Sequence, residues 1–241
     1  MSASERPSER RASARTAVVW DALDPLLDAG APLDVLDIGG GTGGSAVRLA
    51  RLGHRVSVVD PSPDALAALA RRAREMGADV AAQQGSAADL LEVVEPDSAD
   101  LVLCHGVLEI VPDPAAALEA IRAVLRPGGH LSLLVAQRTA AVLARAMAGH
   151  FGQAIALLDE TTSVGRSGRR FTYDEAAAAL ATAEFSITAV HAVRVFADLV
   201  PGSLLDLEPG AASALVELEQ AVAQRPDYRA LAAQLHFTAR R

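Results

Sequence analysis

Short apolar segments alternate along this chain with longer segments whose apolar residues recur at helical spacing. The pattern predicts strands at residues 35–38, 55–60, 79–84, 99–105, 130–136, 187–196 and 234–240. Most of the segments between them have the length and periodicity of amphipathic helices. Strands that alternate with helices in this way form a parallel sheet with helices on both faces. The pattern therefore predicts an α/β fold.

Two segments stand outside this alternation. Residues 1–14 are rich in Ser, Glu and Arg and are predicted to form a flexible arm, which leaves residues 15–241 as one domain. After Ala136 the rhythm changes, because an Ala-rich helical stretch is followed by a segment rich in Gly and Arg. We expect residues 137–172 to be an insertion, and insertions at the carboxyl edge of such sheets usually shape a substrate site.

Local signals place two of the predicted helix starts. Ser62 precedes Pro63, a pairing typical of an N-cap followed by the first helical residue. Thr172 is followed three residues later by Glu175, the spacing of a capping box. Helices are therefore expected to begin after each of these caps.

Five glycines lie within six residues directly after the first predicted strand. Gly39, Gly41 and Gly44 satisfy the spacing G-x-G-x-x-G, and a helical pattern follows at once. Glycine allows a turn with positive φ and a close approach of the backbone to a ligand, while the next helix presents unpaired N–H groups. This arrangement predicts a site for a nucleotide-like cofactor at the carboxyl end of the first strand. The glycine spacing alone leaves a nicotinamide dinucleotide open.

Composition limits the partners of the chain. The net charge is −8, every basic residue is Arg, and 3% of the residues are aromatic. A negative protein repels nucleic acid at long range, so contact with RNA would require a local arginine patch. Scarce aromatics also leave few surfaces on which bases could stack. These features favour a small-molecule substrate over RNA.

Other compositional features bear on environment and cofactors. The single cysteine, Cys104, lies in an apolar strand and is expected to be a buried thiol. We expect no bound metal. No apolar run has the length of a membrane span, and residues 1–15 lack the apolar core of a secretory signal, so a cytoplasmic location is expected.

Four separate segments carry a family resemblance. They are the motif D-x-G-x-G-x-G from Asp37 to Gly43, the strand-end acid Asp60, the segment 100–109, and the turn 125–129. Together they resemble the class I S-adenosylmethionine (SAM) dependent methyltransferases. That resemblance implies a doubly wound, Rossmann-like sheet of seven strands, mostly parallel with an antiparallel last strand, and SAM as the cofactor.

More narrowly, the chain resembles the bacterial tRNA 5-carboxymethoxyuridine methyltransferases. Segments 15–20, 105–109, 193–198 and 236–240 fit the pattern of that subfamily in order. The region 137–172 departs from it, being shorter and without a lysine-rich stretch. Aromatic residues after the fifth strand are replaced by Val135, Gln137 and Arg138. The methyl acceptor, tRNA or a small molecule, therefore stays open.

The resemblance implies a set of cofactor contacts: Arg15, Asp37, Gly39, Gly40, Gly41, Asp60, Ala87, Ala88 and His105. Asp60 follows Gly39 by 21 residues at a strand end, where a carboxylate accepts hydrogen bonds from ribose hydroxyls. Arg15 matches an arginine that binds the carboxylate of SAM. Asp37 either holds the glycine turn or faces the cofactor's ammonium group. Ala87 and Ala88 would frame the adenine, with Asp89 orienting their loop, and His105 would lie beside the methyl group.

The chemistry also constrains the acceptor. A carboxylate with a pKa of about 4 is ionised at neutral pH and needs no general base, whereas an amine or phenol usually does. The sequence shows no dedicated base, which fits O-methylation of a carboxylate, and Glu109 is expected to be a surface or capping acid. An anionic substrate would have four candidate anchors: Arg166, Arg169, Arg170 and Arg194. Two further classes stay open, an NAD-dependent oxidoreductase and a non-catalytic SAM-binding module.

Overall fold

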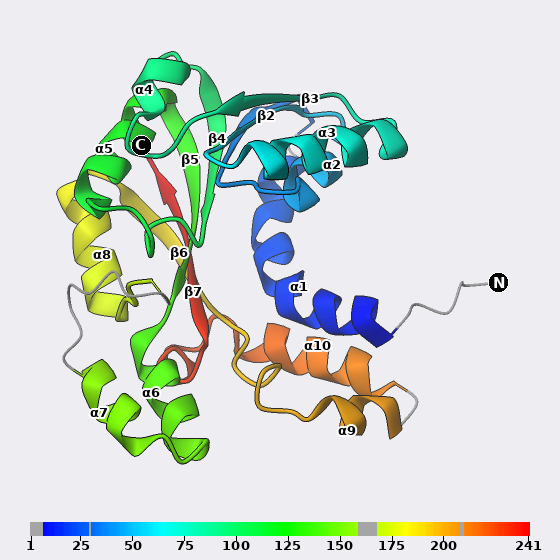
Figure 1. Cartoon of the computed structure of the whole chain (residues 1–241), viewed down its shortest axis with the longest axis vertical. Coiled ribbons are helices and arrows are strands. Elements are labelled where there is room, and N and C mark those ends of the chain that lie inside the picture. Colours follow the sequence, from blue (N-terminus) through cyan, green and yellow to red (C-terminus); the bar gives the residue numbers. More distant parts are fainter. Residues whose placement is uncertain (1–6, 29, 159–167, 208–209) are drawn as a thin grey trace.

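A single seven-stranded sheet forms the centre of the molecule, in the order β3-β2-β1-β4-β5-β7-β6 (Figure 1). The computed structural model describes residues 7–28, 30–158, 168–207 and 210–241. Its strands are β1 (Asp34–Ile38), β2 (Arg55–Asp60), β3 (Val80–Gln84), β4 (Ala99–His105), β5 (Leu125–Ala136), β6 (Ser186–Val193) and β7 (Gln234–Arg240). The first five run parallel, and β7 is antiparallel to both β5 and β6. The predicted fold class and the antiparallel last strand are confirmed.

Helices cover both faces of the sheet because successive strand residues point to opposite sides. Val35 packs with α1 (Pro7–Leu27), α2 (Gly44–Arg51) and α3 (Pro63–Met76), whereas Leu36 packs with α4 (Leu90–Val93), α5 (Pro114–Val124) and α8 (Tyr173–Thr182). The helix α10 (Ala211–Val222) lies along α1. This two-sided burial explains the nearly continuous apolar character of β1 and β4.

The predicted helix caps are present. The Ser62 hydroxyl accepts a hydrogen bond of 3.2 Å from the amide of Ala65 at the start of α3. Thr172 and Glu175 form a complete capping box at the start of α8, in which each side chain bonds the backbone of the other residue. Both predictions are confirmed.

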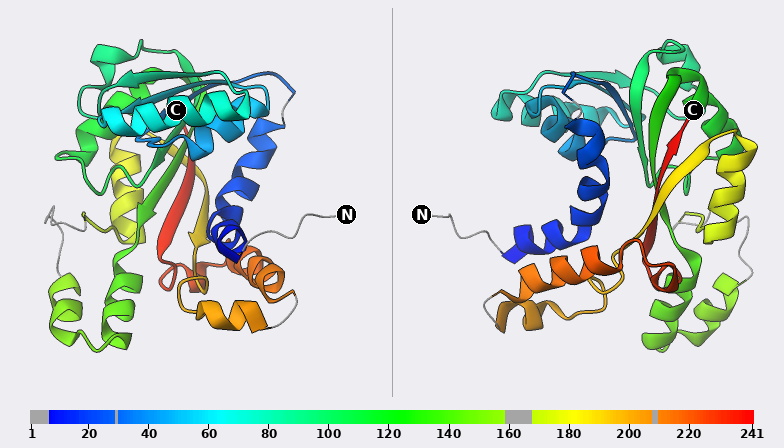
Figure 2. Two further views of the ribbon diagram at one scale, coloured as in Figure 1. Left: turned by 45° about the vertical axis from the view of Figure 1, so that its right-hand side comes forward. Right: turned by 180° about the vertical axis from the view of Figure 1, so that it is seen from behind.

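Several boundaries differ from the sequence-based expectations. The helix α1 begins at Pro7, within the predicted arm, and continues through Pro25. In its described part, the insertion forms two short helices, α6 (Arg138–Met147) and α7 (Phe151–Leu158), which meet at Gly149, a residue with a φ of +76°. They project beyond the sheet at the end where β5 finishes (Figure 2). The helix α9 (Gly202–Leu207) follows β6 and had no clear sequence signal.

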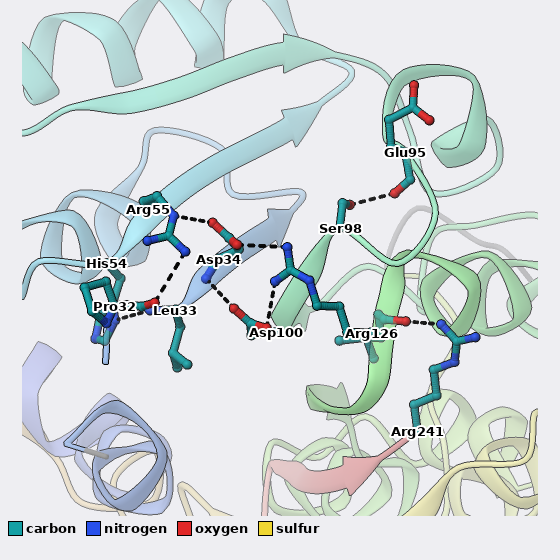
Figure 3. Close-up of polar contacts among 11 residues, drawn as sticks. Pro32, Leu33, Asp34, His54, Arg55, Glu95, Ser98, Asp100, Arg126 and Arg241 are labelled. Atoms are coloured by element: carbon teal, nitrogen blue, oxygen red, sulfur yellow. Dashed lines mark hydrogen bonds and ion pairs between the residues drawn. The ribbon is translucent and has the colours of Figure 1, made fainter. Parts of the chain in front are cut away.

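Ion pairs join the amino-terminal edge of the sheet (Figure 3). The Arg126 guanidinium lies 2.9 Å from Asp34 and 2.7 Å from Asp100, and Asp34 also pairs with Arg55. These side chains connect β1, β2, β4 and β5. Hydrogen bonding to Arg55 is the main cause that lowers the pKa of Asp34. The segment 125–129 therefore stabilises the edge of the sheet opposite the glycine turn. This structural role accounts for its residues, and no ligand contact is needed to explain them.

The described residues include neither a candidate membrane span nor a candidate metal site. None of the helices traced there combines the length and apolar character of a membrane span. Nor do three or more His, Cys, Asp or Glu side chains gather there in a metal-binding arrangement.

Candidate cofactor and substrate site

The glycine turn joins β1 to α2 at the carboxyl edge of the sheet. Gly39 has a φ of +68°, and a Cβ there would lie 2.7 Å from Cγ2 of Val107, so the backbone conformation and the close packing both require glycine. Gly41 has a φ of +54°, but a Cβ there would meet no protein atom closer than 3.8 Å. The turn is thus tightly packed against Val107 at Gly39, whereas there is open space beside Gly41.

Asp60, at the end of β2, holds this turn. Its Oδ2 accepts a hydrogen bond of 2.9 Å from the amide of Gly41, and its Oδ1 accepts one of 2.9 Å from the amide of Ser62. The side chain is buried. Each oxygen keeps a further lone pair for a ligand. Sequence reasoning placed Asp60 at the site but missed its bond to the turn.

Asp37 is a buried carboxyl group without a protein partner. It is 4% exposed, and among the described residues no donor is hydrogen-bonded to its side chain. Burial, and secondarily the charge of Asp60, raise the pKa of Asp37 to about 7. The side chain packs against the glycine turn without bonding it, since a Cβ at Gly40 would lie 2.7 Å from Oδ2 of Asp37. An unpaired buried carboxyl beside an open turn fits a site that a ligand's cationic group would complete.

The loop after β3 borders the same edge. Ala87 is buried and Ala88 is exposed, and the Ala88 amide donates to the Ser86 hydroxyl at 3.2 Å. The Asp89 carboxylate accepts hydrogen bonds from the amide and the hydroxyl of Ser86. Asp89 therefore orients this loop, as predicted.

A cavity of about 340 Å³ lies beside the start of α2. Its lining residues come from six parts of the chain: Arg15, Thr16, Val19, Trp20, Ser45, His105, Leu134, Arg194 and Gln234. Three residues predicted from the sequence, Arg15, His105 and Arg194, thus meet at one cleft.

The two arginines of the cleft share one carboxylate. Arg15 lies 3.2 Å from Asp198, and Arg194 pairs with the same side chain while donating to Gln234 at 3.3 Å. Arg194 has a φ of +59°, an uncommon conformation for a residue with a side chain, and its Nε is buried without a partner in the described part of the chain. Strained backbone and unsatisfied donors gather at ligand sites more often than elsewhere.

Glu219 of α10 supports the segment that carries Arg194 and Asp198. It is 0% exposed, and its carboxylate accepts hydrogen bonds of 2.9, 2.8 and 2.7 Å from the amides of Val195, Phe196 and Ala197. Sequence reasoning missed this residue. The available signal was its position between Leu215 and Val222 on the apolar side of a helix, where a charged side chain needs buried partners.

His105 ends β4 at the cleft. Its Nε2 lies 2.8 Å from Oγ of Ser132, and burial lowers the pKa of His105 to about 4. The ring is therefore neutral at physiological pH. It contacts the interior through one nitrogen and lines the cleft with the rest of the ring.

The other proposed anchors lie in the insertion. Arg166 lies outside the described residues. Arg169 is directed back into the protein, because its Nη1 donates to the carbonyl oxygens of Leu108 and Val111 at 3.4 and 3.3 Å. The Arg170 carbonyl accepts a 3.1 Å hydrogen bond from Arg138. Arg169 thus holds the loop in place, a structural role that its exposed-looking sequence context did not reveal.

Glu109 differs from the expectation of a surface or capping acid. It is 6% exposed, its Oε1 accepts a hydrogen bond of 2.7 Å from the amide of Ala136, and its carbonyl accepts one of 2.7 Å from the amide of Arg169. Burial raises the pKa of Glu109. That expectation is wrong, and the residue instead joins the end of β5 to the returning loop of the insertion.

The chain is similar in sequence to several known proteins. Residues 35–129 match a family model described as a methyltransferase domain. The chain is 32% identical over 233 residues to tRNA 5-carboxymethoxyuridine methyltransferase of Escherichia coli (strain K12), a match that covers 94% of this chain and 88% of that protein. It is 38% identical over 115 residues to ubiquinone biosynthesis O-methyltransferase of Xanthomonas euvesicatoria pv. vesicatoria, covering 48% of each.

Solved structures share the fold. A SAM-dependent methyltransferase from Mesorhizobium loti superposes with a TM-score of 0.62 at 21% identity, covering 95% of this chain and all of that one. Magnesium protoporphyrin IX methyltransferase from Synechocystis PCC 6803, with bound SAH, gives a TM-score of 0.61 at 17% identity, with coverages of 96% and 83%. These structures show the fold, and the similarity to the E. coli enzyme shows that this chain belongs to the class I SAM-dependent methyltransferases.

Proposed function

We propose that this methyltransferase transfers the methyl group of SAM to a carboxylate oxygen, and that the carboxylate is that of 5-carboxymethoxyuridine in tRNA. The observation that carries the proposal is similarity over 94% of the chain to an enzyme of that name. Because the match leaves out only 6% of the chain, it includes Arg194, which lines the cleft. A tRNA acceptor is also consistent with the predicted cytoplasmic location.

In this proposal the cofactor is held at the glycine turn. Gly39 and Gly40 give backbone contact, Asp60 accepts hydrogen bonds from the ribose, and Asp37 faces the amino group. Ala87 and Ala88 frame the base, while Arg15 meets the carboxylate. The unpaired carboxyl of Asp37 and the open space at Gly41 support this placement.

The acceptor is held in the cleft. Arg194 is the anchor for its carboxylate, supported by the unpaired Nε of that side chain. When bound, SAM supplies an electrophilic methyl group on a sulfonium. The chain's own residues orient the acceptor, since a carboxylate ionised at neutral pH needs no base. The neutral His105 is suited to hydrogen bonding at this pH.

A second observation favours an RNA acceptor despite the net charge of −8. Five arginines of α2 and α3 are exposed, and none of them forms an ion pair with another described residue: Arg48, Arg51, Arg71, Arg72 and Arg74. The same two helices carry only two carboxylates, Asp64 and Glu75. Three of the arginines line a groove of about 490 Å³ between the helices. This surface is the local arginine patch that contact with phosphates requires.

The direct test is transfer of a tritiated methyl group from SAM. We expect incorporation into tRNA that carries 5-carboxymethoxyuridine and none into the same tRNA with an unmodified uridine. Arg194→Gln should lower incorporation, because a hydrogen bond to a charged group contributes about 1.5–3 kcal/mol. The affinity for SAM should stay within a few-fold of the wild-type value. Label confined to small carboxylic acids of a metabolite extract would replace the tRNA proposal. Cofactor binding without transfer to either would indicate a binding module.

A further inference from the structure

His105 belongs to a buried chain of three polar side chains that crosses the sheet. Its Nε2 lies 2.8 Å from the hydroxyl of Ser132, and that hydroxyl lies 2.8 Å from Nε2 of His236. The three residues come from β4, β5 and β7, which are neighbours in the sheet. Ser132 and His236 are both 0% exposed, so the hydrogen bonds between these three side chains are shielded from solvent.

The tautomers of the two histidines are coupled, because both rings bond the same Ser132 hydroxyl. Burial keeps both rings neutral near pH 7, because it lowers the pKa of each. The Ser132 hydroxyl has one proton, which it can give to only one of the two Nε2 atoms. The other Nε2 must then be the donor to Ser132. If His236 is protonated on Nε2, His105 accepts there and is protonated on Nδ1, whereas the opposite arrangement reverses both rings.

The surroundings of His236 decide between these arrangements. Its Nδ1 is buried without a hydrogen-bond partner among the described residues. His191 stacks on the ring with a centroid separation of 5.5 Å and offers no bond to that nitrogen. A buried N–H without an acceptor is rarer and more costly than a buried lone pair without a donor. His236 is therefore protonated on Nε2, and the Nδ1 of His105 is the protonated nitrogen.

We propose that Ser132 and His236 are positioning residues that hold His105 with its proton on Nδ1, so that the cleft gains a neutral N–H donor for a carboxylate oxygen. The nitrogen that bonds Ser132 faces the interior, which leaves Nδ1 as the polar atom that His105 can offer to the cavity it lines. Arg15 and Arg194 line the same cavity, so it is built for anions. The inference rests on the proposed function, in which both the acceptor and the cofactor's amino-acid part supply a carboxylate.

The tautomers can be read directly from the imidazole ¹⁵N chemical shifts of protein labelled at histidine, with His105→Gln and His236→Gln used for assignment. We expect Nδ1 to be protonated in His105 and Nε2 in His236. His130→Gln, in β5 between Leu101 of β4 and Arg240 of β7, is the control and should leave these signals unchanged. Protonation of His105 on Nε2 in the wild-type enzyme would overturn the inference, whatever the activity.

A pair of variants then links the tautomer to function. Ser132→Ala removes the hydroxyl that donates to Nε2 of His105, so the interior no longer selects the tautomer, and we expect part of the His105 population to carry its proton on Nε2. Ser132→Thr keeps the hydroxyl and should retain the wild-type tautomer. Carboxylate binding in Ser132→Ala should weaken by the inverse of the fraction of His105 that keeps its proton on Nδ1, so about threefold when that fraction is about a third.

Kinetics identify which carboxylate is bound. An increase in KM for the modified tRNA in Ser132→Ala, with kcat and the Kd for SAM little changed, assigns the donor to the acceptor. An increase in the Kd for SAM assigns it to the cofactor. If neither constant changes although the tautomer has switched, the role of the donor is refuted. If the wild-type enzyme shows the expected tautomers but methylates no tRNA, the proposed function and the acceptor assignment fail, while the proton arrangement stands.

Discussion

The carboxylate of Asp60 accepts a hydrogen bond of 2.9 Å from the amide of Gly41, so the acid at the end of β2 holds the turn at the end of β1. The family resemblance gives this acid one role, binding the ribose of the cofactor. The structure adds a second, because the same carboxylate also bonds the amide of Ser62 before α3. In the proposed site, cofactor affinity and turn geometry thus depend on the same side chain.

Replacement of Asp60 should therefore weaken SAM binding strongly. We expect Asp60→Ala to raise the Kd for SAM by about 10- to 100-fold, since hydrogen bonds to a charged group contribute about 1.5–3 kcal/mol. Isothermal titration calorimetry measures the change directly. Asp64→Ala removes an exposed carboxylate from the first turn of α3 and is the matched control. Undiminished affinity in Asp60→Ala would refute the placement of the cofactor at this turn.

Gly41 allows folding and binding to be separated. A methyl group there has room within the protein, so Gly41→Ala should cost about 1–2 kcal/mol through its positive φ alone. In the proposed site, however, that methyl occupies space needed by the cofactor, so SAM binding should be lost. Gly77→Ala is an exact backbone control, because Gly77 has a φ of +60° with nothing within 4 Å but lies at the end of α3. Equal stability losses with retained SAM binding in both variants would contradict the site.

The sequence predicted which residues end the strands at this site better than it predicted the hydrogen bonds between them. Strand ends, caps and glycines are local signals, and they located Asp60, His105 and the turn. The partnership of Asp60 with Gly41, and of His105 with Ser132 and His236, depends on which strands become neighbours. That order is a property of the assembled sheet, which no single segment encodes.

The insertion shows the other limit of sequence reasoning. An arginine in a Gly-rich loop has the same local sequence whether it faces solvent or returns to the protein, as Arg169 does. Conversely, the exposed arginines of α2 and α3 looked like the ordinary polar face of two helices. The absence of ion pairs with other described residues and the groove between the helices, which support the proposed surface for phosphates, are properties of the folded protein.

Asp37 should make the stability of the free enzyme depend on pH. Its pKa is raised from 3.8 to about 7 in the folded state, so between these values the folded chain holds a proton that the unfolded chain has lost. Stability therefore falls as pH rises from about 4 to 7, by a total of ~4 kcal/mol, and then stays constant. Asp37→Asn removes this loss and should be more stable than the wild type at pH 8, yet little different near pH 4.

Urea unfolding of both proteins at pH 5 and pH 8, without SAM, measures this effect. The buried histidines act in the opposite direction, because their lowered pKa values make stability fall on acidification, but they are common to both proteins and cancel in the difference. If Asp37 also meets the amino group of SAM, the stabilised variant should bind the cofactor more weakly. A variant that shows the wild-type pH dependence would disprove the raised pKa.

The arginine surface of α2 and α3 should determine how tRNA affinity depends on salt. Each phosphate contact in a duplex contributes about 0.9 to the slope of log K against log salt concentration. Arg51→Gln combined with Arg72→Gln should therefore reduce the slope by about 2 and weaken binding without changing SAM affinity. Arg48 is kept because it stacks on Trp20, which lines the cleft. Arg225→Gln with Arg240→Gln removes equal charge from exposed positions elsewhere, and an equal change of slope in that control would show that only net charge matters.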